Sequence, residues 1–312
     1  MKALPSSASA ALAVALLAGS SAHAFRLPSA RHCPVFPANN AWNQRVDGLP
    51  VARDSAQLIA SIGLDAPVHA DFGSGTWNGG PIGIPFDVVS RKTQLHRVSF
   101  AYAEESDRVR YPIPRRVHIE GGAHATGDRH AVLVDKSTCR LYELYDLRHT
   151  GHGWRAGSGA TWSLRSNHLR HAGWTSADAA GLPIFAGLAR WDEVARGTID
   201  HALRFTAPQT RRAYVYPARH YASNSTDPAL PPMGLRVRLK ASVSIASFPR
   251  QARVVLKALQ RYGMILADNG SPWYVSGAPN RHWSNDALHT LGRLTGADFE
   301  VVDTSSLPHP TK

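Results

Sequence analysis

Cysteine is scarce in this 312-residue sequence, which contains only Cys33 and Cys139. An even pair in an exported chain indicates a single disulfide between them. Cys139 lies between two strand-like runs, so we do not expect it to act as a nucleophile. With no further cysteine, the histidines have no Cys partners for a zinc site, and we expect neither a metal nor another cofactor.

Long hydrophobic runs are absent outside the N-terminus. Residues 1–24 combine Lys2, the apolar run 11–18 and the sequence Ala-His-Ala, which is typical of a cleaved secretory signal peptide. No Cys stands at the predicted cut, which disfavours a lipoprotein. Downstream, no stretch approaches the roughly 20 apolar residues that a membrane helix needs. We therefore expect a secreted or periplasmic protein that starts at Phe25 and does not insert into a membrane.

Several well-known catalytic motifs are also missing. The sequence has no G-x-S-x-G, no H-E-x-x-H, no G-x-x-x-x-G-K and no dinucleotide-binding glycine pattern. These absences count against serine hydrolases with a nucleophile elbow, zinc peptidases, P-loop NTPases and Rossmann enzymes. No linker composition or internal repeat divides the chain. We expect residues 25–312 to form one sheet-rich globular domain, with length enough for two lobes.

Negative charge is in the minority. The sequence has 35 Lys plus Arg against 23 Asp plus Glu, a formal net charge of +12 at pH 7. In an exported protein this balance favours an anionic glycan or cell surface over nucleic acid, although it is equally explained by solubility alone. We predict a polysaccharide partner, which can be acidic, no nucleic-acid partner and a monomeric state.

Most of the hydrophobic patterning has a period of two. The segments 130–135 and 140–146 are separated by four residues and predict a β-hairpin. Residues 198–205 place Ile199, His201, Leu203 and Phe205 on one face of a predicted strand. Residues 234–240 alternate apolar side chains with an outward row of Arg236, Arg238 and Lys240. Helical spacing is confined to 55–63, 249–263 and 285–294. The fold class predicted is mainly β with peripheral helices (α+β), as an antiparallel β-sandwich or a sheet-rich single domain.

The predicted strand 141–146 carries one carboxylate on each face beside aromatic rings. Glu143 lies on the face of Leu141 and Tyr145, and Asp146 lies on the other. An apolar setting raises the pKa of a carboxyl group, as a glycosidase proton donor requires. We take Glu143 as a candidate catalytic residue, with pairing to a surface arginine as the structural alternative.

Asp178 stands in the segment 173–184, among Ala, Gly and Leu residues. Thr175 followed three residues later by Asp178 resembles the capping box of a helix start, which is a structural interpretation. The functional interpretation is that small residues admit a ligand close to the acid, while Trp174 offers a flat apolar wall. Asp178 is therefore a second candidate catalytic residue, and Trp174 a candidate substrate contact.

Further candidates lie downstream and near the N-terminus. The segment 214–225 combines Tyr216, Arg219 and His220, which is typical of a sugar-binding rim and equally of a sheet edge. Asp268 ends an apolar run and is a third candidate catalytic residue, although Asp before Asn-Gly also favours a turn. Trp77, in a glycine-rich segment, is a candidate for stacking on a sugar ring.

Three function classes remain open. We favour a secreted glycoside hydrolase that acts on a polysaccharide through paired carboxylates from Glu143, Asp178 and Asp268. A second possibility is a lyase on a uronic-acid polymer, in which Arg219 or Arg236 neutralises the substrate carboxylate. The third is a non-catalytic glycan-binding or adhesive protein.

Overall fold

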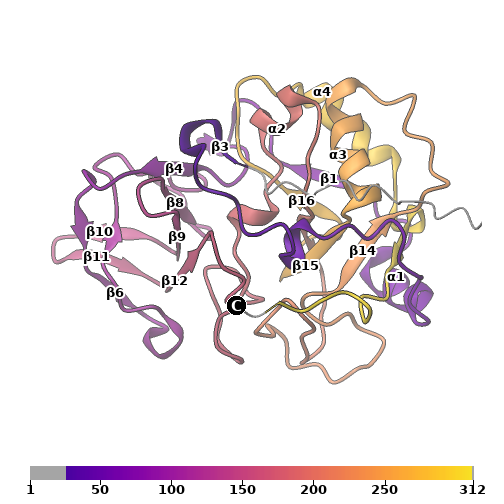
Figure 1. Ribbon diagram of the computed structural model, residues 1–312, viewed down its shortest axis with the longest axis horizontal. Coiled ribbons are helices and arrows are strands. Elements are labelled where there is room, and N and C mark those ends of the chain that lie inside the picture. Colours follow the sequence, from indigo (N-terminus) through magenta and orange to yellow (C-terminus); the bar gives the residue numbers. More distant parts are fainter. Residues whose placement is uncertain (1–25, 311–312) are drawn as a thin grey trace, which may run out of the picture.

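The computed structural model describes residues 26–310, so the predicted signal peptide lies outside the described residues (Figure 1). The largest sheet is mixed: β1–β16 and β13–β15 run parallel, and the other pairs run antiparallel. Figure 1 shows this sheet together with the longer helices at one end of the molecule. Its strands, in spatial order, are β1 (His69–Asp71), β16 (Tyr274–Ser276), β13 (Leu203–Ala207), β15 (Met264–Asn269), β14 (Arg236–Leu239) and β17 (Phe299–Val301).

A four-stranded sheet lies at the other end of the molecule, beside a small three-stranded sheet (Figure 1). Its order is β12 (Ser158–Ser163), β9 (Arg140–Tyr145), β8 (Ala131–Asp135) and β4 (Phe86–Val89). The antiparallel pairing of β8 with β9 confirms the predicted hairpin. Asp135 closes its turn, because its carboxylate accepts hydrogen bonds from the Ser137 N–H and the Thr138 hydroxyl at 2.8 and 2.6 Å.

The remaining strands are short. The three-stranded sheet consists of β10 (Arg148–Thr150), β11 (Gly153–Ala156) and β6 (Val98–Phe100). Two-stranded ribbons are formed by β2 (Thr76–Trp77) with β3 (Gly80–Pro81), and by β5 (Leu95–His96) with β7 (Tyr111–Pro112). The first ribbon presents Trp77 to solvent with 73% of its surface exposed.

The helices are α1 (Ser55–Gly63), α2 (Trp191–Arg196), α3 (Arg250–Arg261) and α4 (Asn285–His289). Three of these four, α1, α3 and α4, begin within one residue of the predicted positions, whereas α2 was not predicted. The predicted helix 285–294 is split, because α4 passes into a 3₁₀ turn at Thr290–Arg293. Short 3₁₀ turns cover Pro28–Ala30, Ala41–Asn43, Ala103–Glu105, Phe185–Gly187, Thr290–Arg293 and Gly296–Asp298.

These elements confirm the mainly β, α+β fold class. The sheets are mixed rather than wholly antiparallel, since β4–β8 and β6–β11 are parallel as well. The strand predicted over 198–205 begins too early, because β13 starts only at Leu203. Arg204 within it is buried between apolar neighbours.

The predicted outward row of cations is wrong at Arg236. This side chain is buried, and its guanidinium donates to the backbone carbonyls of Ala41, Gln44 and Tyr262 at 2.8–3.0 Å. Burial lowers its pKa to about 9. Three carbonyl acceptors replace the water that an outward arginine would bind, so Arg236 fastens the N-terminal segment to the large sheet.

The disulfide between Cys33 and Cys139 is present, as predicted. It spans 106 residues and ties the N-terminal segment to the turn between β8 and β9. Crosslinks over loops of this length restrict the unfolded chain strongly. Among residues 26–310, no helix combines the length and apolar character needed to cross a bilayer.

Candidate functional site

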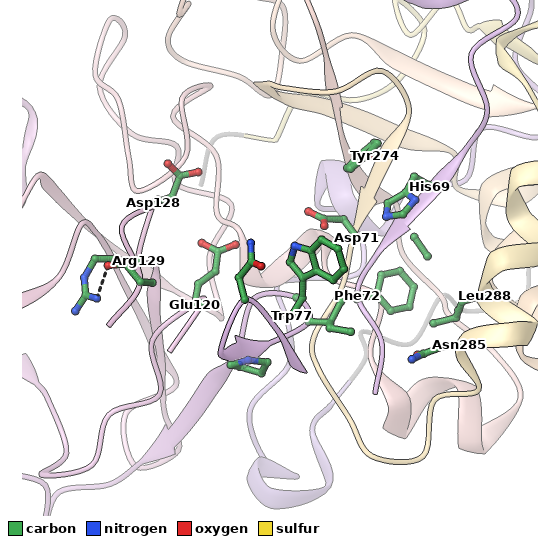
Figure 2. Close-up of a pocket in the computed structure, with 18 of the residues that line it drawn as sticks. His69, Asp71, Phe72, Trp77, Glu120, Asp128, Arg129, Tyr274, Asn285 and Leu288 are labelled. Carbon is green, nitrogen blue, oxygen red and sulfur yellow. Dashed lines mark hydrogen bonds between the residues drawn. The ribbon is translucent and has the colours of Figure 1, made fainter. Parts of the chain in front are cut away.

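Two neighbouring hollows lie among the sheets, and Asp128 contributes to the wall of both. The first, which we call the acid pocket, has a volume of about 450 Å³ and is lined by Asp128, His130, Asp178, His220 and Asp268, with Tyr102 and Tyr145 among the other lining residues. The second, the Trp77 pocket, has a volume of about 690 Å³ and is lined by Asp71, Trp77, Glu120, Asp128 and Tyr274 among others. Figure 2 shows that its acidic residues come from separate segments of the chain.

Asp178 is fixed by a tight turn rather than by a helix start. Its Oδ1 accepts a hydrogen bond from the Ala180 N–H at 2.8 Å, and no helix follows, so the capping-box interpretation is wrong. Gly181 allows the turn because its φ is +69° and a Cβ there would lie 2.6 Å from the Trp174 carbonyl oxygen. The small residues around Asp178 therefore serve close packing of the backbone.

The second Asp178 oxygen pairs with a buried arginine. Asp178 Oδ2 lies 2.7 Å from Arg204 Nη2, and the Asp178 side chain has no exposed surface. Burial raises the pKa of Asp178, and the guanidinium opposes this rise only in part.

Asp268 approaches the same guanidinium from the end of β15. Its Oδ2 lies 4.0 Å from Arg204 Nη2, and 27% of its side chain is exposed. Its Oδ1 accepts a hydrogen bond from the Asn269 N–H at 2.8 Å. Burial and then the neighbouring Asp178 raise the pKa of Asp268 to about 7. The two acids therefore compete for one cation, and Asp268 is the member that opens towards solvent.

His130 faces Glu120 at the start of β8. Its Nδ1 lies 2.5 Å from Glu120 Oε2, and its Nε2 lies 2.8 Å from the Ala177 carbonyl oxygen. Burial alone lowers the pKa of His130, but the charge and hydrogen bond of Glu120 outweigh it and raise the value to about 9. The same pairing overcomes the effect of burial on Glu120 and lowers the pKa of that carboxyl group.

Glu143, the first sequence candidate, is not among the residues that line the acid pocket. It is completely buried, and its two oxygens accept from the backbone N–H groups of Ile184 and Phe185 at 2.9 and 2.8 Å. Burial raises its pKa to about 7 although both hydrogen bonds favour the charged form. The pairing with a surface arginine that we considered is not what holds it; Glu143 instead anchors the 3₁₀ turn Phe185–Gly187.

The predicted substrate contacts divide between different places. His220 lines the acid pocket, with its Nδ1 2.8 Å from the Ala179 carbonyl oxygen. Trp174 lines a separate groove, where its ring lies 5.6 Å from the guanidinium of Arg170. Tyr216 stacks on His309 with ring centroids 4.0 Å apart, and Arg219 Nε donates to a backbone carbonyl. The structure thus brings Asp178, Asp268 and His220 together, with Trp77 at the adjoining pocket.

Sequence reasoning missed Arg204, the residue that joins the two acids. Its only signal was a lone charge inside the apolar run of β13. Asp71, Glu120 and Asp128 were missed as well, because Asp71 lies on β1, the other two lie in the irregular connection between β7 and β8, and no local pattern links them. Together with Asp178 and Asp268, these make five carboxylates around the two pockets, facing the charges of Arg204 and His130.

Comparison of the chain with protein-family models, curated proteins and solved structures gave no significant match.

Proposed function

We propose that this protein is a secreted glycoside hydrolase that cleaves a polysaccharide, with Asp268 as the proton donor and Asp178 as its buried partner carboxylate. The observation that carries the proposal is that both acids lie within 4.0 Å of one nitrogen of Arg204. Glycosidic bonds are broken by carboxyl groups in this kind of partly apolar setting.

Asp268 has the properties required of a proton donor. It is the more exposed of the two acids, and its pKa of about 7 keeps a substantial fraction protonated at neutral pH. It passes its proton to the glycosidic oxygen as the bond to the sugar carbon breaks. Water supplies the hydroxyl for that carbon, and the proton that the water releases returns to the Asp178–Asp268 pair.

Asp178 acts on the protonation of Asp268 and not on the substrate. Asp178 belongs to the pocket wall, but its side chain has no exposed surface, so we assign it no direct contact with the sugar. Its negative charge disfavours ionisation of Asp268 and so holds the proton in place until the substrate accepts it. Asp178 is therefore a positioning residue in this proposal.

The walls of the two pockets suit a sugar chain. Tyr102 and Tyr145 line the acid pocket, and Trp77 gives an exposed aromatic face at the adjoining pocket. Aromatic faces pack against the apolar side of pyranose rings. The carboxyl groups around the two pockets outnumber the two cations, Arg204 and His130, so we propose an uncharged sugar unit at the cleavage position.

The lyase alternative loses the arginines on which it depended. Arg236 is buried against three backbone carbonyls, and Arg219 donates to the Arg170 carbonyl oxygen. Neither lines the acid pocket. A binding-only protein remains the second candidate, because the same pockets can hold a glycan without cleaving it.

The test is a panel of polysaccharides incubated with purified protein lacking residues 1–24. We expect new reducing ends, which disappear in Asp268→Asn and persist in Asp54→Asn. Asp54 is a suitable control because it is exposed and its side chain caps no helix N–H group. An ultraviolet-absorbing unsaturated product would replace this proposal with a lyase. Glycan binding without any product, unchanged by Asp268→Asn, would replace it with a binding protein.

A further inference from the structure

We infer that Glu120, Asp128 and His130 form a binding site for one divalent transition-metal ion of the Zn²⁺ or Mn²⁺ class. One ligand atom from each of the three residues lies within 4.8 Å of the others. The site borders both pockets, since Asp128 lines the two of them. This inference goes beyond the proposed glycan cleavage and does not depend on it.

The backbone places the first two ligands side by side. The Glu120 N–H donates to the His130 carbonyl oxygen at 3.0 Å, so the two residues are held together independently of their side chains. Their side chains are also in contact, with 2.5 Å between His130 Nδ1 and Glu120 Oε2. Glu120 keeps 26% of its side chain exposed, which leaves it room to move apart when an ion enters.

His130 is oriented in the way that metal-bound histidines are. Its Nε2 is directed at the Ala177 carbonyl oxygen, 2.8 Å away, in a fully buried position. A backbone carbonyl at this nitrogen fixes the ring and leaves Nδ1 to bind the ion. The imidazole therefore presents Nδ1 to the carboxylates, and an ion that binds there replaces the proton that Nδ1 shares with Glu120.

Arg129 holds the third ligand in place and keeps its own charge away. Its guanidinium donates to the carbonyl oxygens of Ala123, Ala125 and Leu147 at 2.9–3.1 Å. These bonds fold back the loop that leads to Asp128.

The charge around the site favours a cation. Asp71 and Glu120 both line the Trp77 pocket. Carboxylates that face one pocket repel each other, and a bound positive ion relieves this repulsion. Figure 2 shows Asp71, Glu120 and Asp128 around one pocket; Arg129 also lines this pocket, but its guanidinium points away from Glu120.

The ligand set selects the kind of ion. Imidazole with carboxylates suits Zn²⁺, Mn²⁺ and their neighbours, whereas Ca²⁺ and Mg²⁺ prefer oxygen ligands alone. Three protein ligands leave a position open to the pocket, as in catalytic rather than structural zinc sites. The other group with ligand-like spacing among residues 26–310 contains Cys33 and Cys139, which are joined in the disulfide and offer no thiolate.

Co²⁺ binding tests the inference without an activity assay. Purified protein lacking residues 1–24 is freed of metal with a chelator and titrated with Co²⁺, followed by visible absorption and by calorimetry. We expect one equivalent to bind and Zn²⁺ to displace it. Glu120→Gln, Asp128→Asn and His130→Gln should each weaken binding at least tenfold.

A matched control comes from a second histidine–carboxylate pair. His118 Nδ1 lies 2.6 Å from Asp87 Oδ1 at an exposed place, and neither residue belongs to a three-ligand group among the described residues. His118→Gln should leave Co²⁺ binding unchanged. Asp128 is exposed, so Asp128→Asn tests the site even if the His130 variant does not fold. No Co²⁺ binding up to 1 mM, or binding unchanged in Asp128→Asn, would overturn the inference and leave His130 and Glu120 as an ordinary ion pair.

Discussion

Arg204 and Asp178 form an ion pair with a separation of 2.7 Å, and neither side chain exposes more than 5% of its surface. Arg204 belongs to β13 of the large sheet, and Asp178 belongs to the tight turn closed by the Ala180 N–H. Arg204 Nη1 also donates to the Ser276 hydroxyl at 2.9 Å on the adjacent strand. The pair therefore joins the base of the acid pocket to two strands, β13 and β16.

Removing Arg204 should be costly. Arg204→Gln leaves the Asp178 carboxylate buried without a cation, and we expect the free energy of unfolding to fall by about 3–5 kcal/mol. Denaturant unfolding at pH 7.5 measures the loss. Arg45→Gln is the control, since the Arg45–Asp47 pair is exposed and should change stability by less than about 1 kcal/mol. Equal effects of the two substitutions would contradict the assignment of Arg204 as the buried counter-ion.

Asp268 should make stability depend on pH. Its pKa is about 7 in the folded protein and 3.8 for the reference group, so the folded state binds more protons between these values. Stability contributed by this group is therefore lost as pH rises from about 4 to about 7. Asp268→Asn abolishes this part of the loss and should stabilise the protein at pH 8 by on the order of 2 kcal/mol, with little effect at pH 4. An unchanged free energy of unfolding at pH 8 would show that burial does not raise the pKa of Asp268.

Glycan cleavage, if Asp268 donates the proton, should decline above pH 7. The groups whose charge acts on Asp268 are Asp178, Arg204 and His130, and Asp268 in turn acts on Tyr145. Asp178→Asn removes the negative neighbour that raises the Asp268 pKa and leaves Arg204 uncompensated, so the declining limb of kcat should move to lower pH by at least one unit. A pH–rate profile distinguishes this from a purely structural role, which would lower kcat equally at every pH.

Glu143 should matter for folding and not for the proton transfer. Glu143→Gln offers one acceptor in place of two to the N–H groups of Ile184 and Phe185, and places an amide donor against one of them. We expect a loss of about 1–3 kcal/mol in stability, with the shape of the pH–rate profile unchanged. Thermal unfolding and kcat measured below the melting temperature check the two halves separately. A shifted pH profile would restore Glu143 as a catalytic candidate.

Trp77 should contribute to glycan binding alone. Its ring is 73% exposed, so Trp77→Ala should leave the melting temperature within about one degree of the parent. The lost stacking surface should raise KM for a long glycan by about tenfold, while kcat stays the same. Trp77→Phe should recover part of the affinity because it keeps an aromatic face. An unchanged KM in the Ala variant would remove Trp77 from the binding surface.

Local patterns were enough to predict the regular elements. The apolar positions Ala252, Val255 and Leu259 recur at helical spacing and are buried in α3, and the hairpin 130–146 follows from alternation and a turn sequence. The disulfide followed from the presence of only two cysteines. Each of these depends on neighbours in sequence or on simple counting.

The site depends on contacts between distant segments, and was predictable only in part. Asp178, Asp268 and His220 were found because an acid or a histidine stands out among small or aromatic residues. Arg204 was not, because its partner lies 26 residues away on a turn whose path no local pattern encodes. For Glu143, alternation predicts which face of the strand it lies on. Its hydrogen-bond partners, the N–H groups of Ile184 and Phe185, could not be predicted, because only the fold brings them to its oxygens.

The strand β8 is buried on both of its faces, and this has a consequence for variants far from either pocket. Val132 and Val134 pack into the main core with the large sheet, whereas Ala131 and Leu133 pack into the smaller core on the opposite side. His130 directly precedes these residues, so a shift of β8 towards either core would also move its ring. A smaller side chain at Leu133 or Val134 would let this strand tilt towards the vacated side. The distance between His130 and Glu120 would then change. Core residues that do not contact a ligand thus help to determine the geometry of the site.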